Sequence, residues 1–545
     1  MLGTVVKAIF AFIFISSAYI LFGFVYRYYQ RSLKFLRGPP RSSLLTGNDY
    51  EIIHQEEVNV IENKWFNEYG TAFRTSTCYG EDALMVADPR ALQYVLHTSG
   101  YRFPKSIDSQ QITKMMFGRG ILWAEGEVHN RQRKALNPAF SATQLRQFLS
   151  LFQRSTARLA NKWKEEQLVS SVVNVSQWLP KITLDVIGES AFDYKFGALD
   201  GHANELGEIF KHMFYILTPQ CRFPSLPPNT DYTLPSLPAV LPTPLANFLC
   251  RFPTKEETRF REFSDASKKV AKSVFRTATE AANGQEDSKG SKDVLSVLLR
   301  SNLTEDPKKA LDEDEGSTRT IMLAGHETTA STTTWLLFEL AKSPKDQQRV
   351  YAEIRDVRAR IGVEAELAVS DYDSMPFFNA VIKEALRLHP IVPTLARQAA
   401  SDDSIPLDFP IITESGEEIS QIPVSKGQRI VLSIAMYNRL TQVWGDDANE
   451  WKPERFIIDS KKKTALGVYA NLMSFSAGVR ACIGWRFAIM ELQAILFGLL
   501  EKFEFSPPPG GLDDIQRVPA GIMIPMKKNN WQEGVQMPLH VKARE

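Results

Sequence analysis

The residues best suited to chemistry lie in one short loop, Phe475 to Gly484, with the sequence FSAGVRACIG. Gly478 and Gly484 permit backbone geometry and a close approach that a Cβ atom would block. Cys482 stands just before a run with helical spacing, and the amide donors and dipole at a helix start favour thiolate over thiol. Arg480 adds a rigid planar fork that suits a carboxylate. The loop therefore predicts a reactive sulfur beside a site for an acidic group.

The other cysteines give Cys482 no neighbour in the sequence. Cys78, Cys221 and Cys250 are scattered with no close pairs, so neither a disulfide framework nor a CxxC metal or redox site is indicated. This pattern favours a reducing compartment. A lone cysteine before a helix is more often a small buried hydrophobe. A single thiolate can, however, bind an iron that a macrocycle already holds by four nitrogens.

Two helical patterns add polar groups. In KEALR, Glu384 and Arg387 share one helix face at i,i+3 spacing, a pair that is common on protein surfaces. In AGHETT, Glu327 and Thr328 follow two small residues within an otherwise apolar helix. A carboxyl and a hydroxyl placed there can move protons. The plainer interpretation is that the threonines bond back to their own helix carbonyls.

The cysteine loop resembles the haem loop of the cytochrome P-450 family, FxxGxRxCxG, at Phe475, Gly478, Arg480, Cys482 and Gly484. The resemblance implies haem b as cofactor, with the Cys482 thiolate as axial ligand of the iron and Arg480 beside a haem propionate. Val479 stands where the family often has proline. The match of the whole loop favours a metal ligand over a buried hydrophobe.

Further matches assign roles by resemblance. Glu384 and Arg387 would join Arg455, in the PERF segment at 453–456, in a mostly buried charge network that holds the haem-side core. Glu327 and Thr328 match the oxygen-binding element AGxE/D-TT, in which the threonine bonds oxygen or water and the acid relays protons.

Three more residues match positions that hold haem propionates. His129 stands where tryptophan often does, and Arg133 follows four residues later, so one helix face presents both donors. Arg397, after Pro390 and Pro393, matches the remaining position. Without the resemblance, the segment around His129 would be equally well explained as a solvated basic helix.

The body is predicted to be mainly α with a minor β sheet, which is the cytochrome P-450 fold by resemblance. Helical patterns cover residues 145–163, 321–340 and 377–388, whereas strand-like runs such as 84–86 and 429–434 are short. Length alone would suggest three or four domains. Because matching motifs run from about residue 36 to beyond 500, we expect one catalytic domain over residues 36–545.

The N-terminal region is predicted to be a membrane anchor. The apolar run at residues 8–26, at roughly 1.5 Å per residue, nearly matches a hydrocarbon core of about 30 Å. Lys7 precedes it and four basic residues follow within 27–37, which places the rest of the chain in the cytosol. A cleaved signal peptide is the alternative, but bulky residues occupy its cleavage position. We expect residues 1–35 to form one transmembrane helix and a basic stop-transfer segment in the endoplasmic reticulum membrane.

Two segments are predicted to be long surface loops. Residues 218–244 are dense in proline, and residues 283–292 in Gly, Ser, Gln and charge. Apolar residues in the first suggest a membrane-facing lid over a lipophilic entrance. Gly316-Ser317 interrupts the stretch before the helix at 321–340, which is slightly shorter than in similar proteins and leaves the start of that helix open.

By resemblance, the protein is expected to be a microsomal, eukaryotic, fungal-type monooxygenase of secondary metabolism. It would insert one oxygen atom from O2 into a lipophilic small molecule by hydroxylation or epoxidation. The chain shows no nicotinamide or flavin fingerprint. Its electrons would therefore come from NADPH through a separate NADPH-cytochrome P-450 reductase, with cytochrome b5 as a further candidate donor. Basic residues for docking are Arg131, Lys134, Arg486 and the lysines at 461–463.

The formal net charge of +1 predicts no attraction to nucleic acid. Two other functions stay open. A haem-thiolate isomerase or dehydratase would act on a peroxide without a reductase, although Glu327 and Thr328 favour oxygen activation. A non-catalytic haem-binding sensor or carrier would use Cys482 without turnover. The substrate itself is not encoded in any motif.

Overall fold

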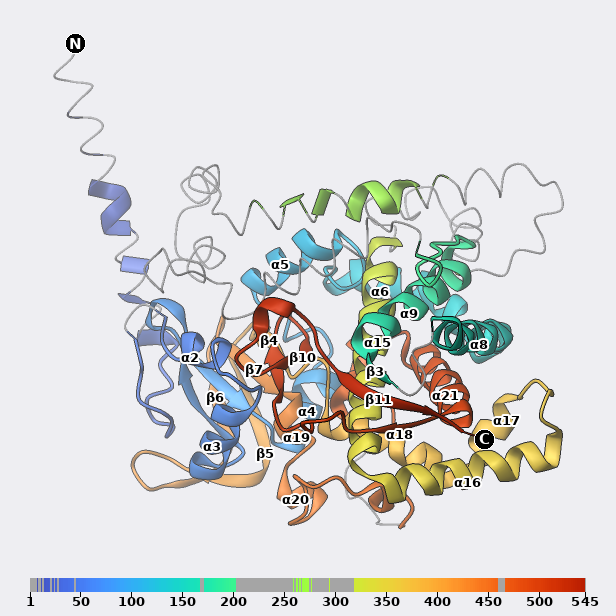
Figure 1. The fold of residues 1–545 in the computed structure, drawn as a ribbon. Coiled ribbons are helices and arrows are strands. Elements are labelled where there is room, and N and C mark those ends of the chain that lie inside the picture. The colour runs from blue at the N-terminus through green and yellow to red at the C-terminus, as the bar shows by residue number, and fades with distance from the viewer. Residues whose placement is uncertain are drawn as a thin grey trace.

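The computed structural model describes residues 29–43, 46–166, 171–201, 318–458 and 466–544 continuously, and separate residues before 29 and between 258 and 294. Helices dominate this part of the chain, and its strands form small sheets (Figure 1). The prediction of a mainly α fold with minor β sheet is confirmed.

The main helices of the described chain are α2 (Asp49–Ile53), α3 (Val60–Tyr69), α4 (Pro89–Gln93), α5 (Ile107–Phe117), α6 (Gly126–Leu136), α7 (Ala142–Arg146), α8 (Leu149–Glu165), α9 (Val175–Phe192), α15 (Thr318–Lys342), α16 (Pro344–Ile361), α17 (Val369–Asp373), α18 (Pro376–Leu388), α19 (Ile434–Tyr437), α20 (Thr441–Trp444) and α21 (Trp485–Lys502). The strands are β1 (Ala72–Ser76), β2 (Asp82–Val86), β3 (Ser171–Asn174), β4 (Thr394–Gln398), β5 (Asp403–Ile412), β6 (Glu418–Val424), β7 (Arg429–Ser433), β8 (Phe503–Ser506), β9 (Ile515–Pro519), β10 (Met523–Lys527) and β11 (Pro538–Ala543).

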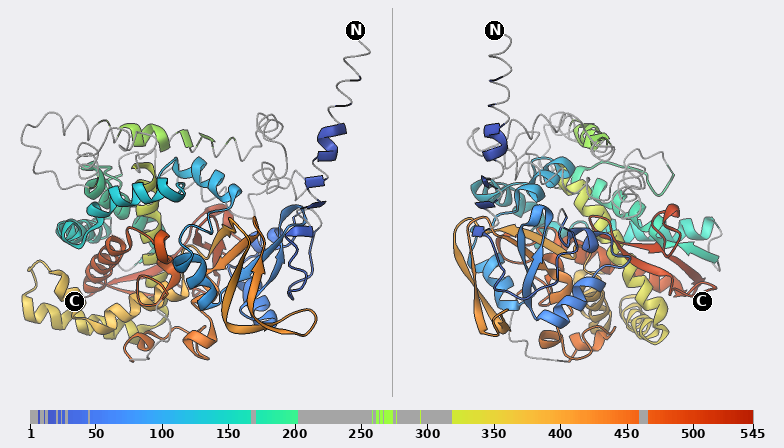
Figure 2. Two further views of the ribbon diagram at one scale, coloured as in Figure 1. Left: turned by 180° about the vertical axis from the view of Figure 1, so that it is seen from behind. Right: turned by 90° about the vertical axis from the view of Figure 1, so that its left-hand side faces the viewer.

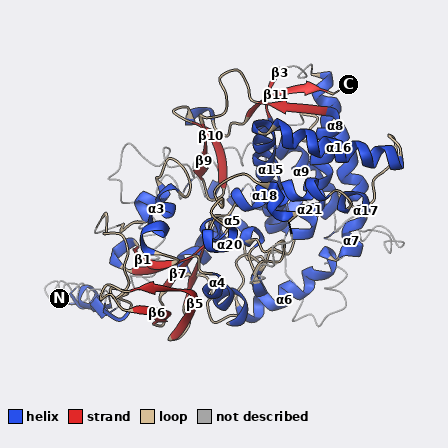
Figure 3. Ribbon diagram, turned by 90° about the horizontal axis from the view of Figure 1, so that it is seen from below, coloured by secondary structure: helices blue, strands red, loops and turns tan. Residues whose placement is uncertain are grey.

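The largest sheet has the strand order β1-β2-β7-β4, in which only the β2–β7 pair is parallel. Strands β5 and β6 form an antiparallel hairpin, and two smaller sheets join β3-β11-β8 and β10-β9. Figure 3 shows the largest sheet and the β5–β6 hairpin on one side of the molecule, with α8, α9, α16 and α21 on the other.

Helix α15 lies at the centre of the helical side and packs against α9, α18 and α21 (Figure 2). Every residue from Thr329 to Ala341 is buried. Gly325 allows close packing here, because a Cβ atom at this position would lie 2.7 Å from Cδ1 of Ile187 on α9. The central helix is therefore held on several sides.

The predicted helices and strands are present, with one difference. The pattern at 145–163 predicts one helix, but the chain turns between α7 and α8. At this turn Phe148 packs against Phe487 of α21, with ring centroids 6.3 Å apart. Helix α18 begins with Pro376, whose fixed φ suits a first helical turn, and ends just before His389-Pro390, since proline disfavours helix in the residue before it.

Several predictions concern residues outside the described chain. These are the loops at 218–244 and 283–292, Gly316-Ser317, and the lysines at 461–463. The predicted anchor at 8–26 lies partly outside it. Within the residues that are described, no helix combines the length and the apolar character needed to cross a membrane.

Candidate functional site

Cys482 lies between a short 3-10 turn, Gly478–Arg480, and the first residue of α21. Its N–H donates to the Phe475 carbonyl oxygen at 2.8 Å, which closes the loop. The Gly484 N–H donates to the sulfur, as expected at a helix start. The prediction that Cys482 lies just before a helix is confirmed.

Two opposing effects act on the pKa of the Cys482 thiol. Burial raises the pKa of Cys482, and this outweighs the lowering by the Gly484 amide and the Arg133 guanidinium. The Gly484 amide thus favours thiolate, as predicted, whereas burial of the sulfur acts against it. Although surrounded by protein, the side chain is accessible to solvent. A bound metal ion would supply the positive charge that removes the proton from this sulfur.

The two loop glycines differ in what they allow. Gly478 has φ +64°, and a Cβ atom there would lie 1.9 Å from the Leu96 carbonyl oxygen, so glycine is required. Gly484 has φ −88°, and a Cβ atom would meet only the Phe140 ring, at 3.7 Å. The predicted steric need for glycine is confirmed at 478. At position 484, the surrounding polypeptide leaves room for a Cβ atom and does not require glycine.

Basic side chains from separate segments converge beside this loop. They are Lys105, which lies just before α5, His129 and Arg133 of α6, Arg397 of β4, and Arg480 of the loop itself. Burial, together with the positive charges of the other four residues, lowers the pKa of His129 to about 3. Burial also lowers the pKa of Lys105 to about 8 and that of Arg397 to about 10, with the charge of Arg480 adding to both effects. The structure thus brings the four predicted propionate ligands together.

Each predicted ligand has a defined position. Arg133 donates through Nη1 to the Ala481 carbonyl oxygen, next to the cysteine. His129 Nδ1 lies 2.7 Å from the Tyr101 hydroxyl oxygen. Arg397 donates through Nη1 to the Ala396 carbonyl oxygen at 2.8 Å, while its buried Nε has no hydrogen-bond partner within the described chain.

Sequence reasoning missed two charged members of the cluster, Lys105 and Glu125. The Glu125 carboxylate accepts hydrogen bonds from Lys105 Nζ at 3.0 Å and from Arg480 Nη2. The Ala124 carbonyl oxygen accepts from the same two side chains, at 3.0 and 3.1 Å. Neither residue belongs to a recognisable motif. Only the folded approach of these segments to Arg480 could reveal them.

The cluster fits a haem. Its four cationic side chains face one carboxylate, an imbalance of charge that is costly in a buried place unless an anion binds. Haem carries two propionate groups, and a cysteine thiolate can bind its iron. The unpartnered Arg397 Nε and the solvent-accessible Cys482 are suitable donors to these two parts.

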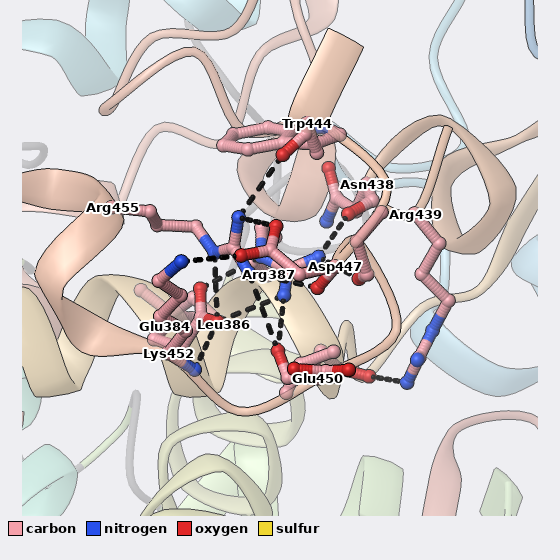
Figure 4. Close-up of polar contacts among 12 residues, drawn as sticks. Glu384, Leu386, Arg387, Asn438, Arg439, Trp444, Asp447, Glu450, Lys452 and Arg455 are labelled. Carbon is pink, nitrogen blue, oxygen red and sulfur yellow. Dashed lines mark hydrogen bonds and ion pairs between the residues drawn. The ribbon is translucent and has the colours of Figure 1, made fainter. Parts of the chain in front are cut away.

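The predicted charge network is present near the end of α18 (Figure 4). Arg387 donates through Nε and Nη2 to the two carboxylate oxygens of Glu384, at 2.7 and 2.8 Å, and both side chains are completely buried. Arg455 Nε donates to the same carboxylate at 2.9 Å. Asp447, which the sequence did not single out, accepts from Arg455 Nη1 at 3.0 Å.

Arg387 also fixes the loop that follows α19. Its guanidinium donates to the carbonyl oxygens of Asn438, Ala448 and Glu450, at 2.8, 2.5 and 3.0 Å. Both the carboxylate and the guanidinium are thus fully engaged, which a buried ion pair requires in order to be stable.

On α15, Thr328 donates to the Ala324 carbonyl oxygen at 2.8 Å, which is the back-bonded geometry of the plainer interpretation. Glu327 Oε1 lies 3.2 Å from His326 Nε2. Ala324, Glu327 and Thr328 are only half-buried on a helix that is otherwise mostly buried. By resemblance, Ala324 and Gly325 would leave space beside the iron for dioxygen. In the structure, the absence of a Cβ atom at Gly325 also lets Ile187 of α9 pack closely against α15.

The comparison with known proteins agrees with this geometry. A family model described as cytochrome P-450 matches residues 37–532. The chain belongs to the cytochrome P-450 family. It is similar to cytochrome P-450 monooxygenase 205 of Postia placenta, with 32% identity over 523 residues that cover 94% of this chain and 93% of the relative.

Other fungal proteins are similar over nearly the same length. Cytochrome P-450 monooxygenase claO of Ampulloclitocybe clavipes is 30% identical, covering 94% of this chain and 93% of its own. The ganoderic acid synthetase of Ganoderma lucidum is 31% identical, covering 90% and 91%. This cytochrome P-450 is therefore an oxidoreductase of the monooxygenase class, and its cofactor is haem b with a cysteine thiolate as axial ligand.

Proposed function

We propose that this cytochrome P-450 inserts one oxygen atom from O2 into a lipophilic small molecule, by hydroxylation or epoxidation. The observation that carries the proposal is the convergence of Arg133, Arg397 and Arg480 beside the solvent-accessible thiol of Cys482. We assign Cys482 as the axial ligand, and these arginines with His129 as the propionate site. Bound haem supplies the iron chemistry that activates O2.

Two side chains of α15 are assigned to proton handling. Thr328 holds its hydroxyl proton on the Ala324 carbonyl oxygen at 2.8 Å, and this bond can be exchanged for one to a ligand or water. Glu327, next to it, is half-buried and can deliver protons from outside the helix. Arg387, Glu384 and Arg455 are structural, since their polar groups are engaged by the protein itself.

The electrons would come from NADPH through NADPH-cytochrome P-450 reductase, with cytochrome b5 as a second candidate. Lys134 and Arg486 are exposed on α6 and α21. Arg133 of α6 donates to the Ala481 carbonyl oxygen in the loop before α21, beside the cysteine. An acidic partner docked there would lie near the proposed iron site.

We also propose one catalytic domain over residues 36–545, anchored by residues 1–35 in the endoplasmic reticulum membrane with the domain on the cytosolic side. The apolar run at 8–26 and the basic residues after it support this. The printed name of the ganoderic acid synthetase relative supports a role in secondary metabolism.

Reconstitution tests the reaction. The full-length protein, a fungal reductase and NADPH are incubated with a panel of lipophilic compounds chosen by their shift of the haem absorption band. We expect NADPH oxidation that depends on compound and reductase, with one oxygen atom from labelled O2 in the product. Turnover of a peroxide without reductase would indicate an isomerase or dehydratase instead. Band shifts without turnover of any compound would indicate a sensor or carrier.

A further inference from the structure

Glu125 is an acidic side chain inside the cluster of basic residues beside Cys482. Its Oε1 accepts from Lys105 Nζ at 3.0 Å and from the Lys105 main-chain N–H at 3.2 Å, and its Oε2 accepts from Arg480 Nη2. The exposed fractions are only 12% for the Lys105 side chain and 8% for that of Arg480. Glu125 therefore partly neutralises the positive charges of Lys105 and Arg480, which are mostly shielded from solvent.

The carboxylate occupies a donor that a haem propionate would use. Charge-assisted bonds from a guanidinium to a carboxylate are short and directional, so two carboxylates can share one Arg480 only by dividing its N–H groups. One of these groups, on Nη1, already bonds the Ala124 carbonyl oxygen at 3.1 Å. A haem propionate and the Glu125 carboxylate would therefore compete for the N–H donors of Arg480.

The backbone makes an exchange of carboxylates possible. Lys105 Nζ and Arg480 Nη1 both donate to the Ala124 carbonyl oxygen, so both cations stay anchored if the Glu125 side chain moves away. The charges of Glu125 and Arg480 also act on Arg397, whose Nε has no hydrogen-bond partner among the residues that the structure describes. His129 and Arg133 lie in the same cluster and add positive charge or none, whereas Glu127 adds a second negative charge that acts on the adjoining Tyr101.

We propose that Glu125 is a built-in competitor of the haem propionates: it holds Arg480 and Lys105 before the cofactor binds and yields at least one of them to a propionate. This positioning role rests on the proposed function, because it takes the cluster to be the propionate site. It follows that Glu125 weakens haem retention while keeping the site ordered in the haem-free protein.

The test is the rate at which the ferric holoprotein loses haem to an excess of apomyoglobin. We expect E125Q to lose haem roughly five- to tenfold more slowly than wild type, since a competing charge-assisted bond has been removed. The matched control is E127Q, which removes an exposed carboxylate two residues away and should leave the rate unchanged. Faster haem loss from E125Q would show that Glu125 stabilises the haem-bound site rather than competing with the propionates. An unchanged rate would show that Glu125 does not affect haem binding. Either result overturns the proposal.

A second cofactor isolates the propionates. Wild type and E125Q are reconstituted with the dimethyl ester of haem, which lacks both carboxylates. We expect the two proteins to lose this ester at the same rate, whereas an equal slowing of ester loss by E125Q would contradict the competition. Should E125Q fold poorly, as judged by circular dichroism, E125D serves in its place. Its shorter carboxylate should reach fewer donors and give an intermediate rate.

The outcomes separate this inference from the proposed function. A wild-type protein that binds no haem at all would defeat the proposed function. A wild-type protein that binds haem normally, with E125Q indistinguishable from it, would defeat only the role of Glu125.

Discussion

Glu384 and Arg387 form a bidentate ion pair, in which Arg387 Nε lies 2.7 Å from Glu384 Oε2 and Arg387 Nη2 lies 2.8 Å from Glu384 Oε1. Neither side chain is exposed to solvent. Removing one partner leaves the other charged and buried. We expect Glu384→Ala to lower the free energy of unfolding by about 3–5 kcal/mol, measured by urea denaturation. The control is Glu454→Ala, in the same PERF segment, because Glu454 pairs with Arg349 at the surface. Its cost should be about 0–1 kcal/mol. Equal costs for the two variants would contradict the structural role of the network.

The two glycines of the cysteine loop should respond differently to alanine. Gly478→Ala should lose at least about 2 kcal/mol of unfolding free energy, because the residue has φ +64° and its Cβ atom would overlap the Leu96 carbonyl. Gly484→Ala should change it by less than about 1 kcal/mol, since φ is −88° and the nearest atom is 3.7 Å away. Thermal denaturation of the haem-free proteins measures both. The reverse order would show that the loop geometry is not as described.

Thr328 should matter for coupling rather than for stability. Thr328→Ala removes only a bond back to the helix, to the Ala324 carbonyl at 2.8 Å, so the unfolding free energy should change by less than about 1 kcal/mol. Hydrogen peroxide formed per NADPH oxidised should rise, and product per NADPH should fall roughly tenfold or more, if this hydroxyl handles protons. Thr332→Ala is the matched control, because Thr332 makes the same kind of bond to the Thr328 carbonyl at 2.8 Å. A similar loss of product in both variants would remove the special role of Thr328.

Glu491 of α21 should make stability depend on pH. Its carboxyl is completely buried, and burial raises its pKa well above 4.5, although the Thr329 hydroxyl favours the charged form slightly. Within the described part of the chain, neither carboxylate oxygen makes a hydrogen bond of ordinary geometry. Above pH 4.5 the folded protein therefore retains a proton that the unfolded chain releases, and stability is lost as pH rises toward the folded pKa.

Glu491→Gln is neutral at every pH and should escape this loss. Its unfolding free energy relative to wild type should grow by up to about 1.4 kcal/mol per pH unit above the unfolded pKa, until the folded pKa is reached. Denaturation at pH 5 and at pH 7.5 measures the difference. Parallel changes in the two proteins would show that Glu491 is not held protonated. The exposed Glu364→Gln should parallel wild type.

The sequence predicts best those contacts whose residues lie close together in one segment of the chain. The pair Glu384–Arg387 and the position of Cys482 before α21 depend on spacing within one segment, and both are as predicted. The contacts of Glu125 with Lys105 and Arg480 join segments far apart in the chain, so no spacing rule revealed them.

Burial adds effects that the local sequence does not show. The local sequence around Cys482 indicates a lowered thiol pKa, but desolvation by the surrounding protein raises it. At Gly325 the missing Cβ atom allows close packing of Ile187 from α9, a contact that the sequence of α15 does not indicate. Each outcome was decided by packing from another part of the chain, which one helix or loop does not encode.

The account as a whole requires that the Cys482 sulfur binds haem iron as a thiolate. The most direct measurement is the absorption difference spectrum of the reduced protein with and without carbon monoxide. We predict the red-shifted Soret band of thiolate-bound haem for wild type and for Cys78→Ser, a change at the other described cysteine, which is buried. Cys482→Ser should lack this band. A wild-type protein without it, or a Cys482→Ser protein that keeps it, would contradict the account.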